Sequence, residues 1–70
     1  METTIHITVN GDAREFVSGR TVADLLDRLG LHPQLVVVEH NREILDRNRL
    51  KEAAVRAGDS FELVHFVGGG

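Results

Sequence analysis

Hydrophobic and polar residues alternate strictly near the start of the chain. Every second side chain of residues 4–9 is aliphatic, so these side chains would share one face of a β-strand while the polar ones face the other way. Asn10-Gly11 follows, and both residues tolerate positive φ, which is typical of a two-residue hairpin turn. Residues 13–17 are then the returning strand. The pattern predicts that the fold begins with an antiparallel hairpin.

The hydrophobic spacing next changes to that of a helix. Within residues 22–29, hydrophobic side chains fall at i, i+3, i+4 and i+7, which is one stripe along a helix. Thr21 suits the N-cap, and Asp24 three positions later can complete a capping box. Gly30 suits the left-handed position that ends a helix, and Pro33 prevents the helix from resuming. We therefore expect one helix that buries a single side.

Three further strands are predicted in the second half of the chain. Residues 35–38 are a short, mostly β-branched run that suits an interior strand. Turn residues at 41–42 lead into a short strand at 43–45. A second turn at 57–59 precedes the last strand, residues 61–67, which leads directly into the final glycines.

Residues 46–56 show no clear periodicity. A short helical turn is expected around residues 48–54, with Leu50 and Val55 as the side chains that anchor it to the core. This stretch connects the two predicted strands on either side of it.

The order strand, strand, helix, strand, short strand, strand predicts an α+β fold. We expect a mixed sheet of four to five strands with one main helix packed across one face, and the β-grasp arrangement of ubiquitin is the natural candidate. In it the first and last strands are parallel neighbours inside the sheet, so the terminal glycines would leave a well-anchored strand. Residues 1–67 would form this domain, and residues 68–70 a flexible C-terminal tail.

Composition narrows the classes of function. Seventy residues, 41% hydrophobic and 27% charged, make one small globular domain with few side chains to spare for a pocket. A net charge of -3 and the lack of Tyr and Trp argue against nucleic acid as a partner. No apolar run approaches the roughly 18 residues of a membrane span, and the first residues do not resemble a signal peptide. We expect a complete, cytoplasmic chain without a membrane partner, in agreement with the absence of Cys.

Side chains that could carry chemistry are sparse. None of the four His residues stands at local metal-ligand spacing from another, so no metal site is predicted. Neither Ser18 nor Ser60 lies in a nucleophile-elbow pattern. Asp24 and Asp27 lie one turn apart on the predicted helix, which is what a solvated polar face shows. No catalytic residue is therefore predicted.

The terminal Gly68-Gly69-Gly70 is the strongest candidate site. Without Cβ atoms this segment is thin enough to enter a narrow channel. An α-carboxyl group has a pKa of about 3.3 to 3.7, so Gly70 would present an ionised oxygen nucleophile that can attack the α-phosphate of ATP. The resulting acyl adenylate is activated toward a sulfur or an amine. A mere flexible chain end is the alternative interpretation.

The last strand is apolar on both faces near its end. Phe61 and Leu63 share one face, and Val64 and Phe66 lie on the other. Ordering three glycines costs about 1 to 2 kcal/mol per residue, so a docking surface must supply the affinity. We predict that Val64, Phe66 and Val67 bind a partner. Alternatively, Val64 and Phe66 cover a small secondary core.

Several segments together carry a family resemblance over nearly the whole chain. They are residues 7–11, 21–26 and 36–39, Asn41 with residues 43–44, and residues 58–59 and 62–67, which lead into the glycines. With these segments the chain resembles the sulfur-carrier proteins of thiamine biosynthesis, which are β-grasp relatives of ubiquitin and of the small subunit of molybdopterin synthase. The chain departs from that family at Asp46, where Pro is frequent, and at Leu50, where Trp is frequent.

The resemblance implies a function for the glycines. An E1-like adenylating enzyme would use ATP to convert the Gly70 carboxylate to an acyl adenylate, while Gly68 and Gly69 thread the active site of that partner. Sulfur from cysteine, delivered by a desulfurase system, would replace AMP, and the thiocarboxylate would donate sulfur to thiazole synthase. The protein would be a cosubstrate, with no catalysis and no bound cofactor of its own.

Three alternatives remain open from the sequence. The first is a sulfur carrier for molybdopterin or another pathway with the same terminal chemistry. The second is a ubiquitin-like modifier that forms amides with lysines of target proteins. The third is a non-covalent β-grasp interaction module, in which the glycines have no chemical role.

Overall fold

A computed structural model describes residues 2–66 of the chain. Within these residues the chain forms five β-strands, one α-helix and two short 3₁₀ helices. The elements are β1 (Thr4–Val9), β2 (Asp12–Val17), α1 (Val22–Arg28), a 3₁₀ helix (Pro33–Leu35), β3 (Val36–His40), β4 (Glu43–Leu45), a second 3₁₀ helix (Arg47–Arg49) and β5 (Ser60–His65).

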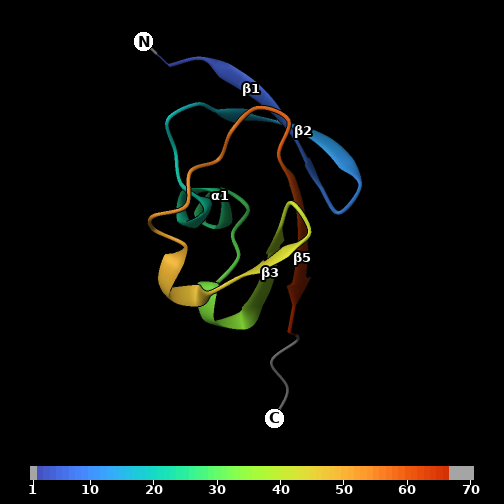
Figure 1. The fold of residues 1–70 in the computed structure, drawn as a ribbon, viewed down its shortest axis with the longest axis vertical. Coiled ribbons are helices and arrows are strands. Elements are labelled where there is room, and N and C mark those ends of the chain that lie inside the picture. The colour runs from blue at the N-terminus through green and yellow to red at the C-terminus, as the bar shows by residue number, and fades with distance from the viewer. Residues whose placement is uncertain (1, 67–70) are drawn as a thin grey trace.

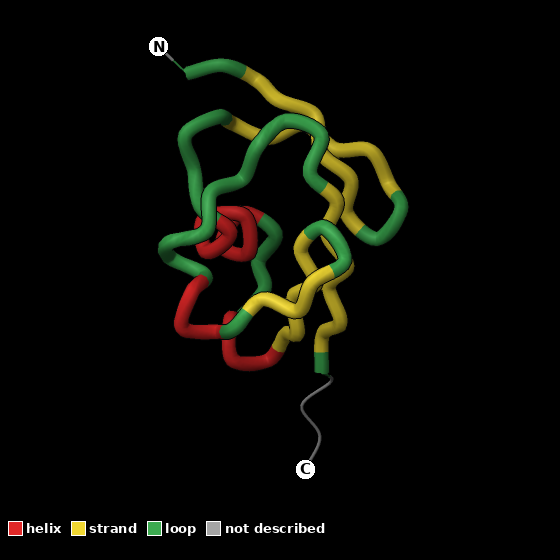
Figure 2. Tube along the Cα trace, viewed as in Figure 1, coloured by secondary structure: helices red, strands yellow, loops and turns green. Residues whose placement is uncertain are grey.

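The strands form one mixed sheet in the order β2-β1-β5-β3-β4. The last strand, β5, is parallel to β1 and antiparallel to β3, so it lies between the first hairpin and the second (Figures 1 and 2). This is the predicted ubiquitin-like β-grasp arrangement, including the parallel first and last strands. As a result, the end of β5 lies at the opposite end of the molecule from the start of β1 (Figure 1).

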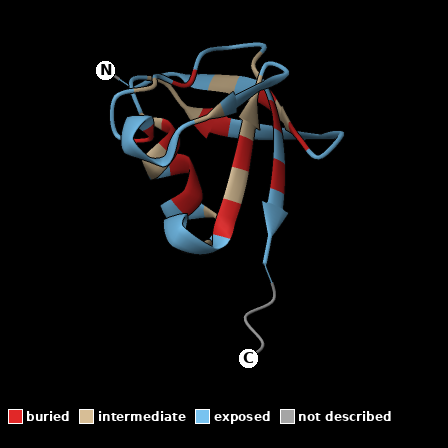
Figure 3. Ribbon diagram, turned by 60° about the horizontal axis from the view of Figure 1, so that its bottom comes forward, coloured by how far each residue is buried: buried red, intermediate tan, exposed pale blue. Residues whose placement is uncertain are grey.

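The core lies between α1 and one face of the sheet. Buried residues recur at every second position of β3 and β5, which Figure 3 shows as alternating bands. The buried hydrophobic residues are Ile7, Val9, Phe16, Val22, Leu25, Leu26, Val36, Val38, Leu50, Val55, Phe61 and Leu63. Among residues 2–66, no helix covers the opposite face of the sheet (Figure 3).

The helix begins and ends as its sequence predicts. The Thr21 hydroxyl accepts a hydrogen bond from the Asp24 N–H (3.3 Å), and the Asp24 carboxylate accepts one from the Thr21 N–H (2.9 Å). This capping box is complete. The backbone bond and a second bond from the Thr21 hydroxyl lower the pKa of the Asp24 carboxyl. At the other end, Gly30 has φ of +73°, the left-handed conformation expected after the helix. The helix has seven residues, and no helix within residues 2–66 could cross a membrane.

Two predicted strand boundaries were displaced. Leu35 was expected in the third strand but belongs to the 3₁₀ helix Pro33–Leu35, because Pro33 fixes the first φ and the His32 side chain accepts a hydrogen bond from the Gln34 N–H (3.1 Å). The strand therefore starts one residue later and continues to His40. The last strand was expected over 61–67 and is found at 60–65, because its partner β3 begins opposite His65. Val67 lies outside the described residues.

The segment from 46 to 56 differs from the predicted helical turn in position and length. The turn is the 3₁₀ helix Arg47–Arg49, and Asp46 caps it by accepting a hydrogen bond from the Asn48 N–H (2.8 Å). Leu50 and Val55 are buried, as predicted for the anchors of this segment. The rest of the segment follows the start of α1, where the Val22 N–H donates to the Ala53 carbonyl (2.9 Å).

Candidate functional site at the end of β5

The predicted site lies at the end of β5 and beyond it. Val64 and Phe66 belong to the described part of the chain, whereas Val67 and residues 68–70 lie outside it. The geometry of the site is therefore that of the strand which leads to the glycines. Its last described residue, Phe66, donates its N–H to the Leu35 carbonyl (2.7 Å), so the chain is still tied to the neighbouring segment at this point.

The two faces of β5 differ as predicted. Phe61 and Leu63 point into the core and are buried, whereas Val64 is 58% exposed and Phe66 47% exposed. A pair of side chains that covered a secondary core would be mostly shielded from water. The exposed fractions therefore favour the docking interpretation of Val64 and Phe66 over the secondary-core interpretation.

Other apolar residues extend this surface. Val37 of β3 lies directly opposite Val64, on the face away from the core, and is half-buried. Leu35, next to Phe66 through the backbone hydrogen bond, is 39% exposed. We call these four residues, Leu35, Val37, Val64 and Phe66, the exit patch. The sequence reasoning missed Leu35 and Val37, although alternation along β3 places Val37 opposite to the buried Val36.

Carboxylates border the exit patch on the side away from the chain end. Glu39 and Glu62 face each other across β3 and β5, each two residues before or after a patch residue on the same face of the sheet. Two like charges at this spacing repel each other. A basic side chain of a partner would relieve that repulsion, so the surface fits a partner with an apolar centre and a basic rim.

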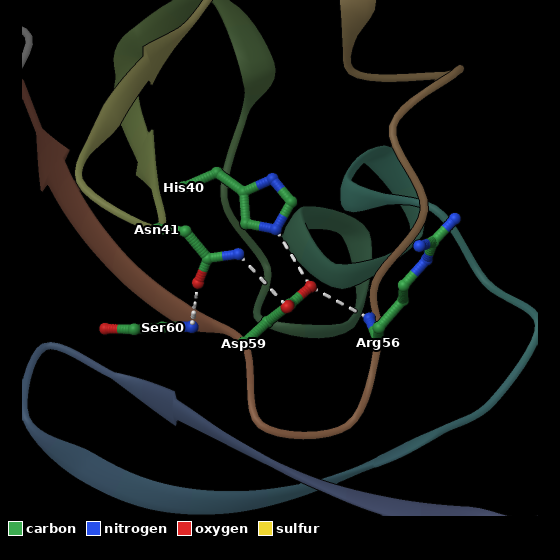
Figure 4. A network of polar contacts seen from close by, with 5 residues as sticks. All are labelled: His40, Asn41, Arg56, Asp59 and Ser60. Carbon is green, nitrogen blue, oxygen red and sulfur yellow. Dashed lines mark hydrogen bonds and ion pairs between the residues drawn. The ribbon is translucent and has the colours of Figure 1, made fainter.

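A polar network fixes the start of β5 (Figure 4). One oxygen of the Asp59 carboxylate bonds to His40 Nε2 (2.8 Å) and accepts from the Arg56 N–H (2.9 Å), and the other accepts from the Asn41 side chain (3.1 Å). The side-chain oxygen of Asn41, Oδ1, in turn accepts a hydrogen bond from the Ser60 N–H (2.8 Å). Burial alone would raise the pKa of the Asp59 carboxyl, but the hydrogen bonds from Arg56, His40 and Asn41 and the charge of His40 lower it overall.

The network includes a histidine–aspartate pair that the sequence analysis did not identify. The side chain of His40, at the end of β3, is 20% exposed and bonds to Asp59, whose side chain is 12% exposed. The partners are 19 positions apart in the sequence, so local spacing could not reveal them. Among residues 2–66, no group of three His, Cys, Asp or Glu side chains could hold a metal ion. The hydrogen bonds of the network join the start of β5 to the turn after β3 and to Arg56.

Comparisons with known proteins show which family the sequence matches. The model of the ThiS family matches residues 7–70 of the chain. The chain is 44% identical over 50 residues to a protein of Bacillus subtilis (strain 168) named "Sulfur carrier protein ThiS", and the match covers 71% of this chain and 76% of that protein.

Two further matches are a much longer sequence relative and a solved structure. A protein of Paramagnetospirillum magneticum named "Thiazole synthase" is 41% identical over 64 residues, which are 91% of this chain but 20% of that protein. The chain thus spans about a fifth of the length of that relative. The crystal structure of a thiamine biosynthesis protein (ThiS) from Geobacter metallireducens superposes with a TM-score of 0.77 at 36% identity, and the match covers 94% of this chain and 100% of that one.

Proposed function

Because the chain belongs to the ThiS family of sulfur carrier proteins, we propose that its terminal Gly70 carries sulfur as a thiocarboxylate in the formation of the thiazole ring of thiamine. The family match over residues 7–70, which includes the terminal glycines, is the observation that carries the proposal. The chain is a protein cosubstrate and not an enzyme.

Two group transfers load the carrier. A carboxylate oxygen of Gly70 attacks the α-phosphorus of ATP, and the bond between that phosphorus and the oxygen bridging to the β-phosphate breaks. Pyrophosphate departs, and the acyl adenylate of Gly70 is formed. The terminal sulfur of a persulfide, formed from cysteine by a desulfurase system, then attacks the acyl carbon, and AMP departs with the oxygen that it shared. A thiol reduces the resulting acyl disulfide and releases the thiocarboxylate. The net change is the replacement of one carboxylate oxygen by sulfur. ATP binds to an E1-like adenylating enzyme and not to the carrier.

The exit patch supplies the affinity that the glycines lack. We propose that residues 68–70 form a flexible tail, with Gly68 and Gly69 inside the active-site channel of the adenylating enzyme. Immobilising such a tail is entropically unfavourable. Val64 and Phe66, which are exposed immediately before the tail, bury apolar surface on docking and offset that cost, and Val67 continues this segment.

Thiazole synthase is the proposed acceptor of the sulfur. A segment similar to this chain makes up a fifth of a relative named "Thiazole synthase", so that protein has a carrier-like segment and further sequence in one polypeptide. Joining two proteins in one chain raises their effective concentration, which supports a direct encounter between carrier and synthase. We also propose that the encounter takes place in the cytoplasm. The chain has no Cys and forms no disulfides, so it does not need an oxidising compartment.

The test is an intact mass measurement. The protein is incubated with the cognate adenylating enzyme, ATP and a cysteine desulfurase system, and a second sample uses the chain without Gly70. We expect replacement of one oxygen by sulfur in the full chain and no such change in the truncated one. Equal yields of the thiolated product from both samples would overturn the assignment to Gly70. Amide adducts with lysines, without thiocarboxylate, would indicate a protein modifier instead.

A further inference from the structure

Asn10 holds β5 with its side chain as well as its backbone. The regular pairing of β1 with β5 covers Thr8 opposite Ser60 and Val9 opposite Phe61, and then β1 turns away into the hairpin. At this turn the Asn10 N–H donates to the Phe61 carbonyl (2.8 Å). The Asn10 amide then reaches Leu63, accepting from its N–H (2.7 Å) and donating to its carbonyl (3.2 Å).

The Asn10 side chain thus makes the hydrogen bonds to β5 that the backbone of a further β1 residue would otherwise make. An asparagine amide presents one acceptor and one donor side by side, as a peptide group does. It can satisfy both backbone groups of Leu63 only because Asn10 has φ of +50°, a left-handed conformation that directs the chain out of the sheet. Asn10 therefore extends the β1 side of the ladder by two residues, toward the end of β5.

The other edge of β5 has a matching residue at the opposite end of the strand. Asn41, in the turn between β3 and β4, has φ of +51°. Its N–H donates to the Ser60 carbonyl (2.8 Å), and its side-chain oxygen accepts from the Ser60 N–H (2.8 Å). Two turn asparagines with the same backbone conformation therefore hold the strand, Asn41 at its beginning and Asn10 close to its end.

The position of Leu63 gives the Asn10 contact its importance. Among residues 2–66, no hydrogen bond ties β5 to the β1 side beyond Leu63, and the bond from Phe66 to Leu35 is on the β3 side. Without the Asn10 side chain, β5 would be held on one edge alone from Glu62 onward, whereas with it the part held on one edge begins after Leu63. A strand held on one edge can pivot about that edge, and the tail that follows Phe66 would pivot with it.

We propose that Asn10 is a positioning residue for the loading of the carrier: by fixing Leu63 it fixes the end of β5, from which the glycine tail starts, relative to the exit patch. This inference rests on the proposed function. A carboxylate that must meet the α-phosphorus of ATP reacts only in a narrow range of distance and angle, and a displacement of about 1 Å can cost up to about 100-fold in rate. The exit patch binds the partner, whereas Asn10 fixes the end of β5, from which the tail starts.

The experiment compares Asn10→Gly with Asn41→Gly. Glycine adopts positive φ without strain, so both variants keep their turn. Asn10→Gly loses the side-chain bonds to Leu63, and Asn41→Gly loses those to Ser60 and to the Asp59 carboxylate. Asn10→Asp is a third variant that keeps the acceptor for the Leu63 N–H and loses the donor to its carbonyl. ATP–pyrophosphate exchange with the cognate adenylating enzyme gives kcat and KM for each carrier. Amide hydrogen exchange reports how firmly the two ends of β5 are held.

We expect Asn10→Gly to lower kcat roughly tenfold with a smaller change in KM, Asn10→Asp to fall between it and the wild type, and Asn41→Gly to leave kcat within about twofold. The amide of Leu63 should exchange faster in Asn10→Gly, and that of Ser60 in Asn41→Gly. An equal loss of kcat in the two glycine variants, or an unchanged Leu63 amide in Asn10→Gly, would overturn the inference. Failure of the wild-type chain to support any exchange would instead contradict the proposed function on which the inference rests.

Discussion

The imidazole of His40 stacks on the ring of Phe61, with centroids 4.6 Å apart and planes inclined by 6°. Phe61 is fully buried in the core, while His40 bonds through Nε2 to Asp59. The stacked pair therefore joins the apolar core to the polar network at the start of β5. Stability and strand position are coupled at this point of the fold, and two predictions follow from it.

The first prediction concerns the stability of the fold at low pH. The folded pKa of Asp59 is lowered from 3.8, so below about pH 4 the unfolded chain binds more protons at this position than the folded one. The stabilisation is complete above the unfolded pKa and is lost as the pH falls through the folded one. We expect Asp59→Asn to lower the free energy of unfolding at neutral pH and to weaken its dependence on pH below about pH 4.

Urea unfolding measured from neutral to strongly acidic pH checks this expectation. Asp12→Asn is the control, since Asp12 is exposed and lies in the hairpin away from the network. The control should keep the acid dependence of the wild type. If Asp59→Asn keeps it too, the network does not contribute to acid sensitivity.

The second prediction concerns the core. Phe61→Ala removes a fully buried ring and its stacking contact with His40, which should lower the free energy of unfolding by about 3 to 5 kcal/mol. Phe66→Ala, at a side chain 47% exposed, should cost about 1 kcal/mol or less. Denaturant titrations of both variants give the comparison. Equal costs would mean that Phe66 belongs to the core and not to a docking surface.

The docking surface is tested by placing a negative charge within it. Phe66→Glu places a carboxylate at the apolar centre of the exit patch, where docking would bury it, so we expect the Kd for the adenylating enzyme to rise about tenfold or more. Thr4→Glu is the matched control, because Thr4 is an exposed residue of β1, on a strand that runs parallel to β5 and starts at the other end of the molecule. Isothermal titration measures both. Unchanged affinity in Phe66→Glu would exclude the exit patch from the interface.

The width of the tail gives a further prediction. Gly69→Val adds a branched side chain to a segment that we propose to enter a narrow channel. Pyrophosphate exchange should fall to background while the Tm stays that of the wild type. Gly69→Ala should retain part of the activity, since a single methyl group is the smallest addition. Exchange at the normal rate in Gly69→Val would show that the partner accepts a wide tail.

Local patterns predicted the elements that depend on neighbours in the sequence. The turn at Asn10-Gly11 needs only two residues that adopt positive φ, and they have φ of +50° and +83°. The capping box of Thr21 and Asp24 is likewise complete within four residues. Both were confirmed because the physical cause and its effect lie within one turn of the chain.

Contacts between distant segments were not predictable in this way. The bond from Asn10 to Leu63 spans 53 positions, and its existence depends on the register between β1 and β5. The segment from 46 to 56 has no periodicity of its own because its backbone follows α1, where the Ala23 N–H donates to the Leu50 carbonyl (2.9 Å). In the candidate site, Val64 and Phe66 were predicted from alternation, whereas Leu35 required the observed pairing of the chain.

The place of β5 in the sheet has a consequence for biosynthesis. A ribosome produces β5 after all other strands, yet β5 joins the hairpin of β1 and β2 to the pair of β3 and β4. A nascent chain that has not reached residue 60 holds two separate halves and cannot complete its sheet. Prematurely terminated translation products would therefore lack Val64 and Phe66, the surface by which we propose that an adenylating enzyme recognises the finished carrier.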